Sequence, residues 1–204
     1  MLDILFVTDF VCPYCLVAKE ALDESLGELG LEARITLQPM ELTPEPAPRV
    51  DTCHDERRKA HYQILVEPCR QMGLDMKLPP NVCPRPYTRL AFEGYFYAEE
   101  QGKGAAYADK VYRAYFIDEK DVGDKEILGD LAAESGLDRE DFLQALEDGI
   151  YGPQEKEAVR YSREELKVQM IPAIYINGRQ ISLKTYDRDE MTGILRQFVK
   201  KEES

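Results

Sequence analysis

The most constraining feature of this sequence is a junction near its start, where an apolar stretch passes directly into a helical pattern. Residues 2–8, LDILFVT, are apolar and partly β-branched, which is typical of a short buried strand. Pro13 suits the first position of a helix, because its missing N–H would be unpaired there. Apolar residues then recur at helical spacing as far as Gly30, and residues 33–37 alternate as in a second strand. The order strand, helix, strand predicts a parallel pair with the helix on one sheet face.

A second strand-rich segment closes the chain. Residues 171–176 and 179–183 flank an Asn-Gly pair, which is a strong signal for a two-residue hairpin. Asp187 can then cap a helix, with Glu190 as its capping-box partner three residues on. The C-terminal segment is therefore predicted to be a β-hairpin followed by a helix.

The middle of the chain is different in character. From about residue 55 to 170 the sequence has no convincing strand, only helical patterns separated by Gly, Pro and Asp. We therefore expect a mixed α/β fold in the order β-α-β, a large helical block, then β-β-α. Residues 1–45 and 170–204 are predicted to form one domain, and residues 46–169 an inserted α-helical domain with its connecting loops.

Composition and charge narrow the class of protein. The 204 residues carry 39 acidic against 26 basic side chains, a net charge of -13, so no basic patch is available to neutralise nucleic-acid phosphates. The opening residues lack the features of a signal sequence, and no later segment is long enough to cross a membrane. We expect a cytoplasmic protein with no nucleic-acid or membrane partner.

The motif Cys12-Pro13-Tyr14-Cys15 lies where the first strand becomes the first helix. Unpaired N–H groups and the helix dipole at that end favour a thiolate on Cys12, and only a thiolate attacks a disulfide. Cys15 lies one turn further on, where it can resolve the mixed disulfide that Cys12 forms. The alternative is half of a zinc site, but the remaining cysteines and histidines supply no second pair at metal-ligand spacing. The motif thus predicts redox chemistry that requires no metal or organic cofactor.

Other residues could assist this chemistry. Asp9 lies three residues before Cys12 and is a candidate proton acceptor for the resolving thiol, or else a solvated or locally bonded residue at the strand end. Pro172 suits the first residue of a strand, and a cis Ile171-Pro172 bond would instead present a backbone edge to an extended substrate. The residues alone leave these alternatives open.

Three further cysteines and a set of aromatic residues have less specific signals. Cys83 could act as an auxiliary thiol at the rim of the site, and Cys53 or Cys69 could pair with it, although free cysteine is commonly a small buried apolar residue. The aromatic side chains could line a groove for unfolded polypeptide. At helical spacing they more often form the core of a helical region, which is the interpretation favoured here for most of Phe92, Tyr95, Phe96, Tyr97, Tyr107, Tyr112, Tyr115 and Phe116.

Taken in order, C-P-Y-C at the head of the first helix, a hairpin opened by I-P and turned at N-G, and a last helix resemble the thioredoxin fold. The long helical insertion resembles the DsbA-like family, and the segments RAYFIDEKDVGDKEIL and AAESGLDREDF resemble its FrnE-like branch of thiol-disulfide oxidoreductases. The resemblance covers nearly the whole chain. It implies that Cys12 is the nucleophile, that Cys15 is the resolving thiol, and that a cis Ile171-Pro172 loop contacts substrate together with Pro13 and Tyr14.

Two departures from related families affect the expected activity. DsbA itself has His where this chain has Tyr14, so its strongly oxidising character does not carry over. Kappa-class glutathione transferases and 2-hydroxychromene-2-carboxylate isomerases share the inserted-helix architecture but have Ser in place of Cys12, and a Ser hydroxyl forms no mixed disulfide. The two thiols therefore favour dithiol exchange with protein or small-molecule partners, with glutathione as a candidate co-substrate. A glutathione-dependent transferase or isomerase and a non-catalytic interaction module are the alternatives; redox direction and oligomeric state stay open.

Overall fold

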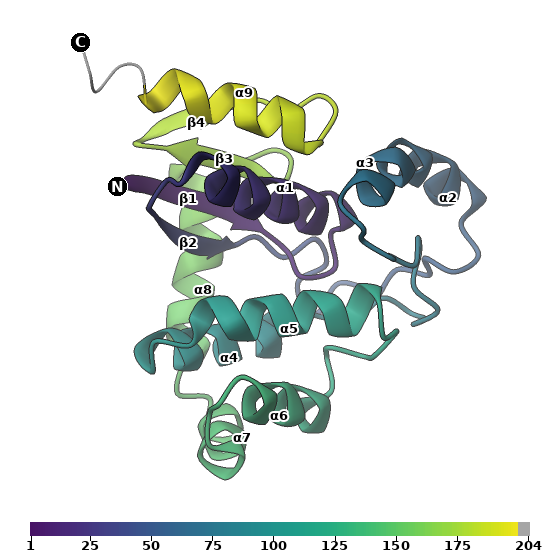
Figure 1. Ribbon diagram of the computed structural model, residues 1–204. Helices are drawn as coiled ribbons and strands as arrows, with labels where there is room; N and C mark the ends of the chain where they lie inside the picture. Colours follow the sequence, from purple (N-terminus) through teal and green to yellow (C-terminus); the bar gives the residue numbers. More distant parts are fainter. Residues whose placement is uncertain (200–204) are drawn as a thin grey trace.

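The computed structural model describes residues 1–199, and it has a four-stranded mixed sheet with helices around it (Figure 1). The strand order is β2-β1-β3-β4. The strands span β1 (Leu2–Thr8), β2 (Ala33–Pro39), β3 (Ala173–Ile176) and β4 (Arg179–Ile181). The predicted α/β thioredoxin fold is confirmed, as is the absence of strands between residues 55 and 170.

The N-terminal β-α-β unit forms as its pattern predicts. Strands β1 and β2 pair in parallel, from Leu2 opposite Ala33 to Thr8 opposite Pro39. Helix α1 (Pro13–Leu29) begins at the predicted proline and ends at Gly30, whose φ of 61° is a left-handed conformation that glycine adopts without steric cost. These short-range signals fix the position of the CPYC motif at the end of β1.

The C-terminal hairpin pairs with the other edge of β1. Strand β3 runs antiparallel to β1, and Asn177 and Gly178 both have positive φ at the predicted turn. The strands are shorter than predicted, since residues 171–172 and 182–183 lie outside them. The final helix is α9 (Arg188–Val199), which packs against α1. Lys200 and the residues after it, which complete the predicted C-terminal part, lie outside the described range.

The predicted capping box at α9 is half right. The Asp187 carboxylate accepts the N–H of Glu190 at 2.8 Å, as a cap should. The Glu190 carboxylate does not return to Asp187; it accepts the N–H groups of Lys184, Thr185 and Tyr186 instead. Glu190 therefore stabilises the loop before the helix, because that loop turns its unpaired N–H groups toward the carboxylate.

The helical region lies between β2 and β3 and forms two groups in Figure 1. Helices α2 and α3, joined by a 3-10 turn (Gln63–Leu65), lie beside one end of α1, whereas the others lie below the sheet in that view, with α6 and α7 beneath α4 and α5. The bounds are α2 (Glu56–Tyr62), α3 (Val66–Gln71), α4 (Arg89–Glu100), α5 (Gly104–Phe116), α6 (Lys125–Glu134), α7 (Arg139–Glu147) and α8 (Gly152–Arg160), which a π-turn (Tyr161–Glu165) extends. None of the helices in residues 1–199 has the length and apolar content that crossing a membrane requires.

One continuous core joins the sheet to the helical region. Phe10, at the end of β1, contacts the rings of Phe92 and Tyr112, with centroids 4.6 and 5.0 Å away. Most of the predicted aromatic set is buried, and only Phe96 and Tyr97 remain half-buried, so the core interpretation is confirmed. The helical region therefore supports the segment that carries the CPYC motif from below.

Candidate active site

Cys12 occupies the N-cap of α1, as predicted, but its sulfur makes a different contact from the one expected. Its backbone is extended, with φ of -96° and ψ of 112°, and its side chain accepts no capping hydrogen bond from the first turn. The thiol instead donates toward the carbonyl oxygen of Ile171, 3.9 Å away. The sulfur is thus turned to the loop that precedes β3, because the S–H finds an acceptor there.

Cys15 lies directly behind Cys12 and is fully buried, whereas Cys12 retains 4% exposure. Both are free thiols, and the two side chains lie next to each other. Burial raises the pKa of Cys15 well above its ordinary value, and the neighbouring Cys12 raises it further, although the Thr8 hydroxyl and the Asp9 backbone act in the opposite direction. Cys12 is therefore the thiol that an incoming molecule meets first.

A buried hydroxyl pair supports Cys15 from the sheet side. Thr8, the last residue of β1, lies next to Cys15, and its hydroxyl hydrogen bonds to the Tyr112 hydroxyl of α5. Thr8 and Tyr112 are both fully buried. The sequence analysis placed Tyr112 in the core and gave Thr8 no role, because no local pattern joins a strand end to a helix about a hundred residues later.

The Ile171-Pro172 bond is cis, as the family resemblance implied. This loop forms part of a groove of about 840 Å³ next to the CPYC motif. The groove is lined mainly by apolar and aromatic side chains, and Met170 and Ile64 in its lining are exposed. An exposed apolar groove beside a nucleophile is typical of a site that binds an apolar or extended ligand.

Tyr14 connects the motif to the first helical group. Its hydroxyl donates to the carbonyl oxygen of His61, at 3.1 Å, and its ring contacts Tyr62 and Tyr186, with centroids 6.3 and 5.2 Å away. Burial raises the pKa of Tyr14, and the neighbouring tyrosines add to this effect. The structure thus brings Pro13, Tyr14 and the Ile171-Pro172 loop around Cys12, whereas His61, Tyr62 and Tyr186 were not identified from the sequence.

Asp9 is completely buried, which rules out the solvated alternative. Its carboxylate accepts the N–H of Leu42 at 2.7 Å and lies near Thr88 and Arg85, and the contact with Cys15 comes from the Asp9 backbone. Burial raises the pKa of Asp9, and the N–H of Leu42 partly counteracts that rise. Asp9 is therefore a buried acid near the dithiol whose carboxylate is bonded to the loop after β2.

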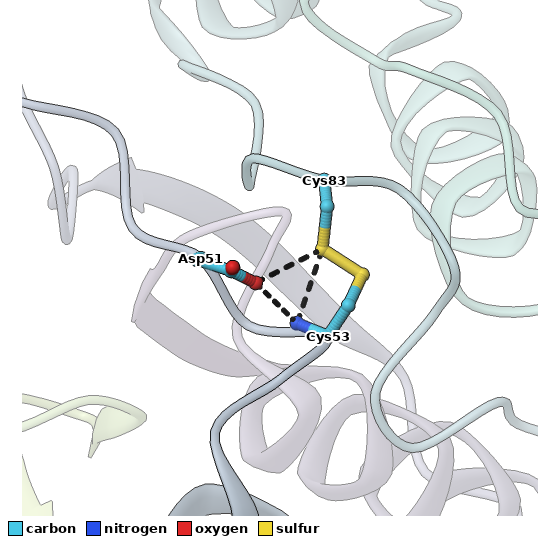
Figure 2. Close-up of side chains that lie close together, drawn as sticks. All are labelled: Asp51, Cys53 and Cys83. Atoms are coloured by element: carbon cyan, nitrogen blue, oxygen red, sulfur yellow. Dashed lines mark hydrogen bonds between the residues drawn. A yellow bond between two sulfur atoms is a disulfide. The ribbon is translucent and has the colours of Figure 1, made fainter.

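The remaining cysteines divide into two kinds. Cys69 is buried in α3 as a free thiol, which fits the expectation of a small apolar residue. Cys53 and Cys83 form a disulfide, which confirms the pairing that the sequence left open for Cys53, whereas the expectation of a small apolar residue is wrong for both. Figure 2 shows this bond beside the Asp51 carboxylate. Asp51, Cys53 and Cys83 are close enough to share a metal ion, but sulfurs joined in a disulfide are not the thiolates that such an ion needs.

These features define a class: a thioredoxin-fold domain whose helical insertion packs under a reduced CPYC motif. Residues 3–195 match the DSBA-like thioredoxin domain family, and the chain belongs to that family. A relative from Bacillus subtilis, the uncharacterized protein YwbO, is 36% identical over 175 residues, which cover 85% of this chain and 86% of the relative. The narrower assignment to the FrnE-like branch stays a prediction.

Solved structures share this fold at low sequence identity. A probable DsbA oxidoreductase from Streptomyces coelicolor is 22% identical with a TM-score of 0.77, covering 97% of this chain and 89% of its own. The cytosolic disulfide reductase DsbM from Pseudomonas aeruginosa, also solved with glutathione, is 16% identical with a TM-score of 0.73, covering 97% and 98%. A 2-hydroxychromene-2-carboxylate isomerase is 16% identical with a TM-score of 0.74, covering 98% and 97%.

Proposed function

We propose that this protein is a thiol-disulfide oxidoreductase that exchanges disulfides through Cys12 and Cys15. The observation that carries the proposal is the pair of neighbouring free thiols at the start of α1, of which Cys12 is 4% exposed and Cys15 is fully buried. An outer thiol backed by a more deeply buried one is the arrangement that two-step exchange needs. The family membership supports the same chemistry.

In the reducing direction, the Cys12 thiolate attacks a substrate disulfide and forms a mixed disulfide, and one substrate sulfur leaves as a thiolate. Cys15 then loses its proton and attacks the Cys12 sulfur, which releases the second substrate thiolate and leaves a Cys12–Cys15 disulfide. Two electrons pass to the substrate, and the reverse sequence oxidises a substrate dithiol. The direction follows from the potential of the pair, for which about 30 mV corresponds to roughly 1.4 kcal/mol.

Because burial raises the pKa of Cys15, the resolving step needs a proton acceptor. Asp9 is the candidate that we retain, since it is a buried acid whose own raised pKa suits it to take a proton. Its carboxylate bonds the loop after β2, so the transfer would run through a small movement or a bridging water. In Asp9→Asn, resolution of a mixed disulfide should slow and its pH profile should shift; an unchanged profile would remove Asp9 from the mechanism.

The groove supports a polypeptide as the substrate. Tyr14 and the Ile171-Pro172 loop, which line the groove, would hold an extended segment across Cys12, and the apolar lining suits non-polar side chains. Pro13, predicted to join them, is buried at the start of α1. Glutathione carries two carboxylates, and the only basic side chains in the lining are Lys167 and the histidine at position 61. We therefore place glutathione second, as a co-substrate that recycles the pair in the cytoplasm, the compartment named for DsbM.

Trapping tests the assignment. Cys15→Ser should accumulate mixed disulfides on Cys12, detectable by mass spectrometry of the intact protein, whereas Cys12→Ser should form none. Cys69→Ala is the matched control, since Cys69 is the other free cysteine and is assigned no role. Turnover of a disulfide substrate that survives Cys12→Ser would overturn the proposal. A glutathione-dependent isomerase or transferase would instead retain activity with serine at position 12.

A further inference from the structure

The Cys53–Cys83 disulfide lies at the base of the excursion that carries α2 and α3. Its two Cα atoms are 6.1 Å apart and are separated by 30 residues in the chain. We call residues 56–71, which include α2, the 3-10 turn and α3, the cap. Figure 1 shows the cap beside the end of α1, apart from helices α4 to α8. The disulfide therefore closes the chain on either side of the cap.

The cap forms one wall of the candidate active site. The carbonyl oxygen of His61 accepts a hydrogen bond from the Tyr14 hydroxyl, and the Tyr62 ring packs on the Tyr14 ring. Ile64 lines the same groove as the Ile171-Pro172 loop. Any movement of the cap therefore changes the width of the groove in front of Cys12.

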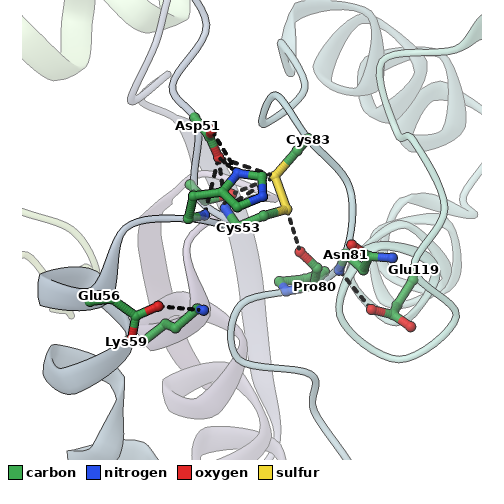
Figure 3. Close-up of a disulfide and its surroundings, with 10 residues drawn as sticks. Asp51, Cys53, Glu56, Lys59, Pro80, Asn81, Cys83 and Glu119 are labelled. Atoms are coloured by element: carbon green, nitrogen blue, oxygen red, sulfur yellow. Dashed lines mark hydrogen bonds and ion pairs between the residues drawn. A yellow bond between two sulfur atoms is a disulfide. The ribbon is translucent and has the colours of Figure 1, made fainter.

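The disulfide is one of several restraints on the cap, because Leu65 and Cys69 of the cap are also buried in the common core. The contacts at the base of the cap lie around the disulfide. The N–H of Arg85 donates to the carbonyl oxygen of Val50 at 2.8 Å, and the N–H of Cys53 points to the Cys83 sulfur at 3.0 Å. Figure 3 shows the bond next to Pro80, whose carbonyl oxygen is 3.7 Å from the Cys53 sulfur, and near the contact between Asn81 and Glu119. Cys83 is exposed, so a small molecule can reach the bond from solvent.

We propose that Cys53–Cys83 is a second thiol-disulfide exchange site, which small neutral or cationic thiols open, and that its opening loosens the cap and admits larger substrates to Cys12. This inference concerns regulation of the proposed active site and rests on the proposed function. It assigns the exposed pair a chemical role separate from that of the CPYC pair.

The exchange balances with two equivalents of thiol. A thiolate attacks the exposed Cys83 sulfur, forms a mixed disulfide there and breaks the Cys53–Cys83 bond. Cys53 leaves as a thiolate, takes a proton from solvent, and can then donate it to the Pro80 carbonyl oxygen. A second thiol attacks the mixed disulfide and releases Cys83, so two thiols become one small disulfide while the protein disulfide becomes a dithiol.

Asp51 sets the preference for the charge of the thiol. Its carboxylate oxygen lies 3.6 Å from the Cys83 sulfur, as Figure 2 shows. Hydrogen bonds from His54 lower the pKa of Asp51, so the carboxylate is ionised at neutral pH. A negative charge next to the attacked sulfur repels an anionic thiol more than a cationic one, and salt screens that difference because the site is exposed.

The first experiment isolates the second site in a Cys12→Ser/Cys15→Ser/Cys69→Ala protein, which keeps only Cys53 and Cys83. Reduction by cysteamine and by mercaptoacetate is followed by mass spectrometry after alkylation. We expect Asp51→Asn to accelerate reduction by mercaptoacetate about threefold at low salt. The rate of reduction by cysteamine should stay the same or fall. Asn keeps the side-chain acceptor for the Cys53 and His54 N–H groups, so the loop should persist. Equal effects on both thiols, or a bond that resists millimolar thiol in the native protein, would overturn the assignment.

The second experiment measures access to Cys12 in a Cys15→Ala/Cys69→Ala protein with the disulfide closed and in the same protein carrying Cys53→Ser/Cys83→Ser. Without the disulfide, the rate at which a polyethylene-glycol maleimide alkylates Cys12, divided by the rate for iodoacetamide, should rise about threefold. The rate of hydrogen exchange in residues 56–71 should rise about tenfold. If neither the ratio of the two alkylation rates nor the hydrogen exchange of residues 56–71 changes, the disulfide does not restrain the cap and the proposal is refuted.

These measurements separate the two proposals. Alkylation of Cys12 and reduction of Cys53–Cys83 need no catalytic turnover, so they succeed or fail whether or not the protein exchanges substrate disulfides. If Cys15→Ser accumulates no mixed disulfide while the cap responds to the disulfide as expected, only the proposed function is rejected.

Discussion

The two cysteine pairs of this protein are chemical opposites. Cys12 and Cys15 are three residues apart, buried, free, and held by one helix start. Cys53 and Cys83 are 30 residues apart, lie on two loops and are joined in a disulfide, with Cys83 exposed. The buried pair keeps two free thiols for chemistry, whereas the bonded pair on the loops constrains the chain between its ends. The comparison teaches that thiol spacing alone does not tell which pair is bonded.

The largest expected effect distinguishes the pairs by catalysis. Cys12→Ser should lower the rate of disulfide exchange by a factor on the order of a thousand or more, because the nucleophile is removed. Cys53→Ser/Cys83→Ser should retain turnover of a small disulfide substrate. Both are measured as the rate of reduction of a chromogenic disulfide under identical thiol concentrations. Loss of that activity on removing the surface pair would break the comparison.

The next effect distinguishes the pairs by stability. Closing a loop of about 30 residues lowers the entropy of the unfolded chain and corresponds to roughly 3 to 4 kcal/mol in the chain-entropy account. We expect Cys53→Ser/Cys83→Ser to lower the free energy of unfolding by up to this amount in urea titrations. The Cys12→Ser/Cys15→Ser variant, compared with the protein whose CPYC pair is reduced, is the control, since it removes no cross-link. If Cys53→Ser/Cys83→Ser lowers the free energy of unfolding less than this control does, the disulfide does not stabilise the fold as proposed.

The third effect is a pH dependence that only the buried pair can show. The folded pKa of Cys15 lies above its ordinary value of 9.0, so the folded state favours the protonated thiol. That contribution is fully present below pH 9 and is lost as the pH rises toward the folded pKa, with a slope of about 1.4 kcal/mol per pH unit. Urea titrations of the reduced protein between pH 7 and 10 should show this decline. The decline should be shallower in Cys15→Ser; an equal slope in both proteins would exclude Cys15 as its source.

The smallest effect concerns the contact between the CPYC motif and the cap. Tyr14→Phe removes the hydrogen bond to the His61 carbonyl oxygen but keeps the ring contacts with Tyr62 and Tyr186. We expect a loss of about 1 kcal/mol in stability and faster hydrogen exchange in residues 56–71. Tyr97→Phe, which alters a half-buried tyrosine in α4, is the matched control. Equal exchange in the two variants would show that Tyr14 does not hold the cap.

Much of the fold was predictable because its signals are short-range. Pro13 and Gly30 mark the ends of α1, and the alternation and the Asn-Gly turn mark the strands. The capping box at α9 failed in one half because the partner of Glu190 depends on how the loop at residues 184–186 is folded. Nothing in the spacing of Asp187 and Glu190 carries that information.

The candidate site was predictable in its reactive atoms and less so in its surroundings. The CPYC motif and the cis Ile171-Pro172 loop were anticipated, the latter through the family resemblance. Cys12 lies at the helix start as predicted, but its sulfur makes no capping hydrogen bond, and a carbonyl oxygen from a distant loop accepts its proton. Location in the cytoplasm stays a prediction, and a lasting Cys53–Cys83 bond would be unusual there, which is a further reason to test its exchange.

The sequence by itself determined the β-α-β unit, the helix start that carries Cys12 and Cys15, and the hairpin that follows Pro172. Each depends on neighbours within one turn of helix or one strand pair, where backbone geometry leaves few choices. Only the tertiary structure decided that Thr8 meets Tyr112 across 104 residues, that Tyr14 bonds His61 across 47, and that Cys53 pairs with Cys83. These contacts depend on how helices pack over a shared core, and packing is a property of the whole chain rather than of any one segment.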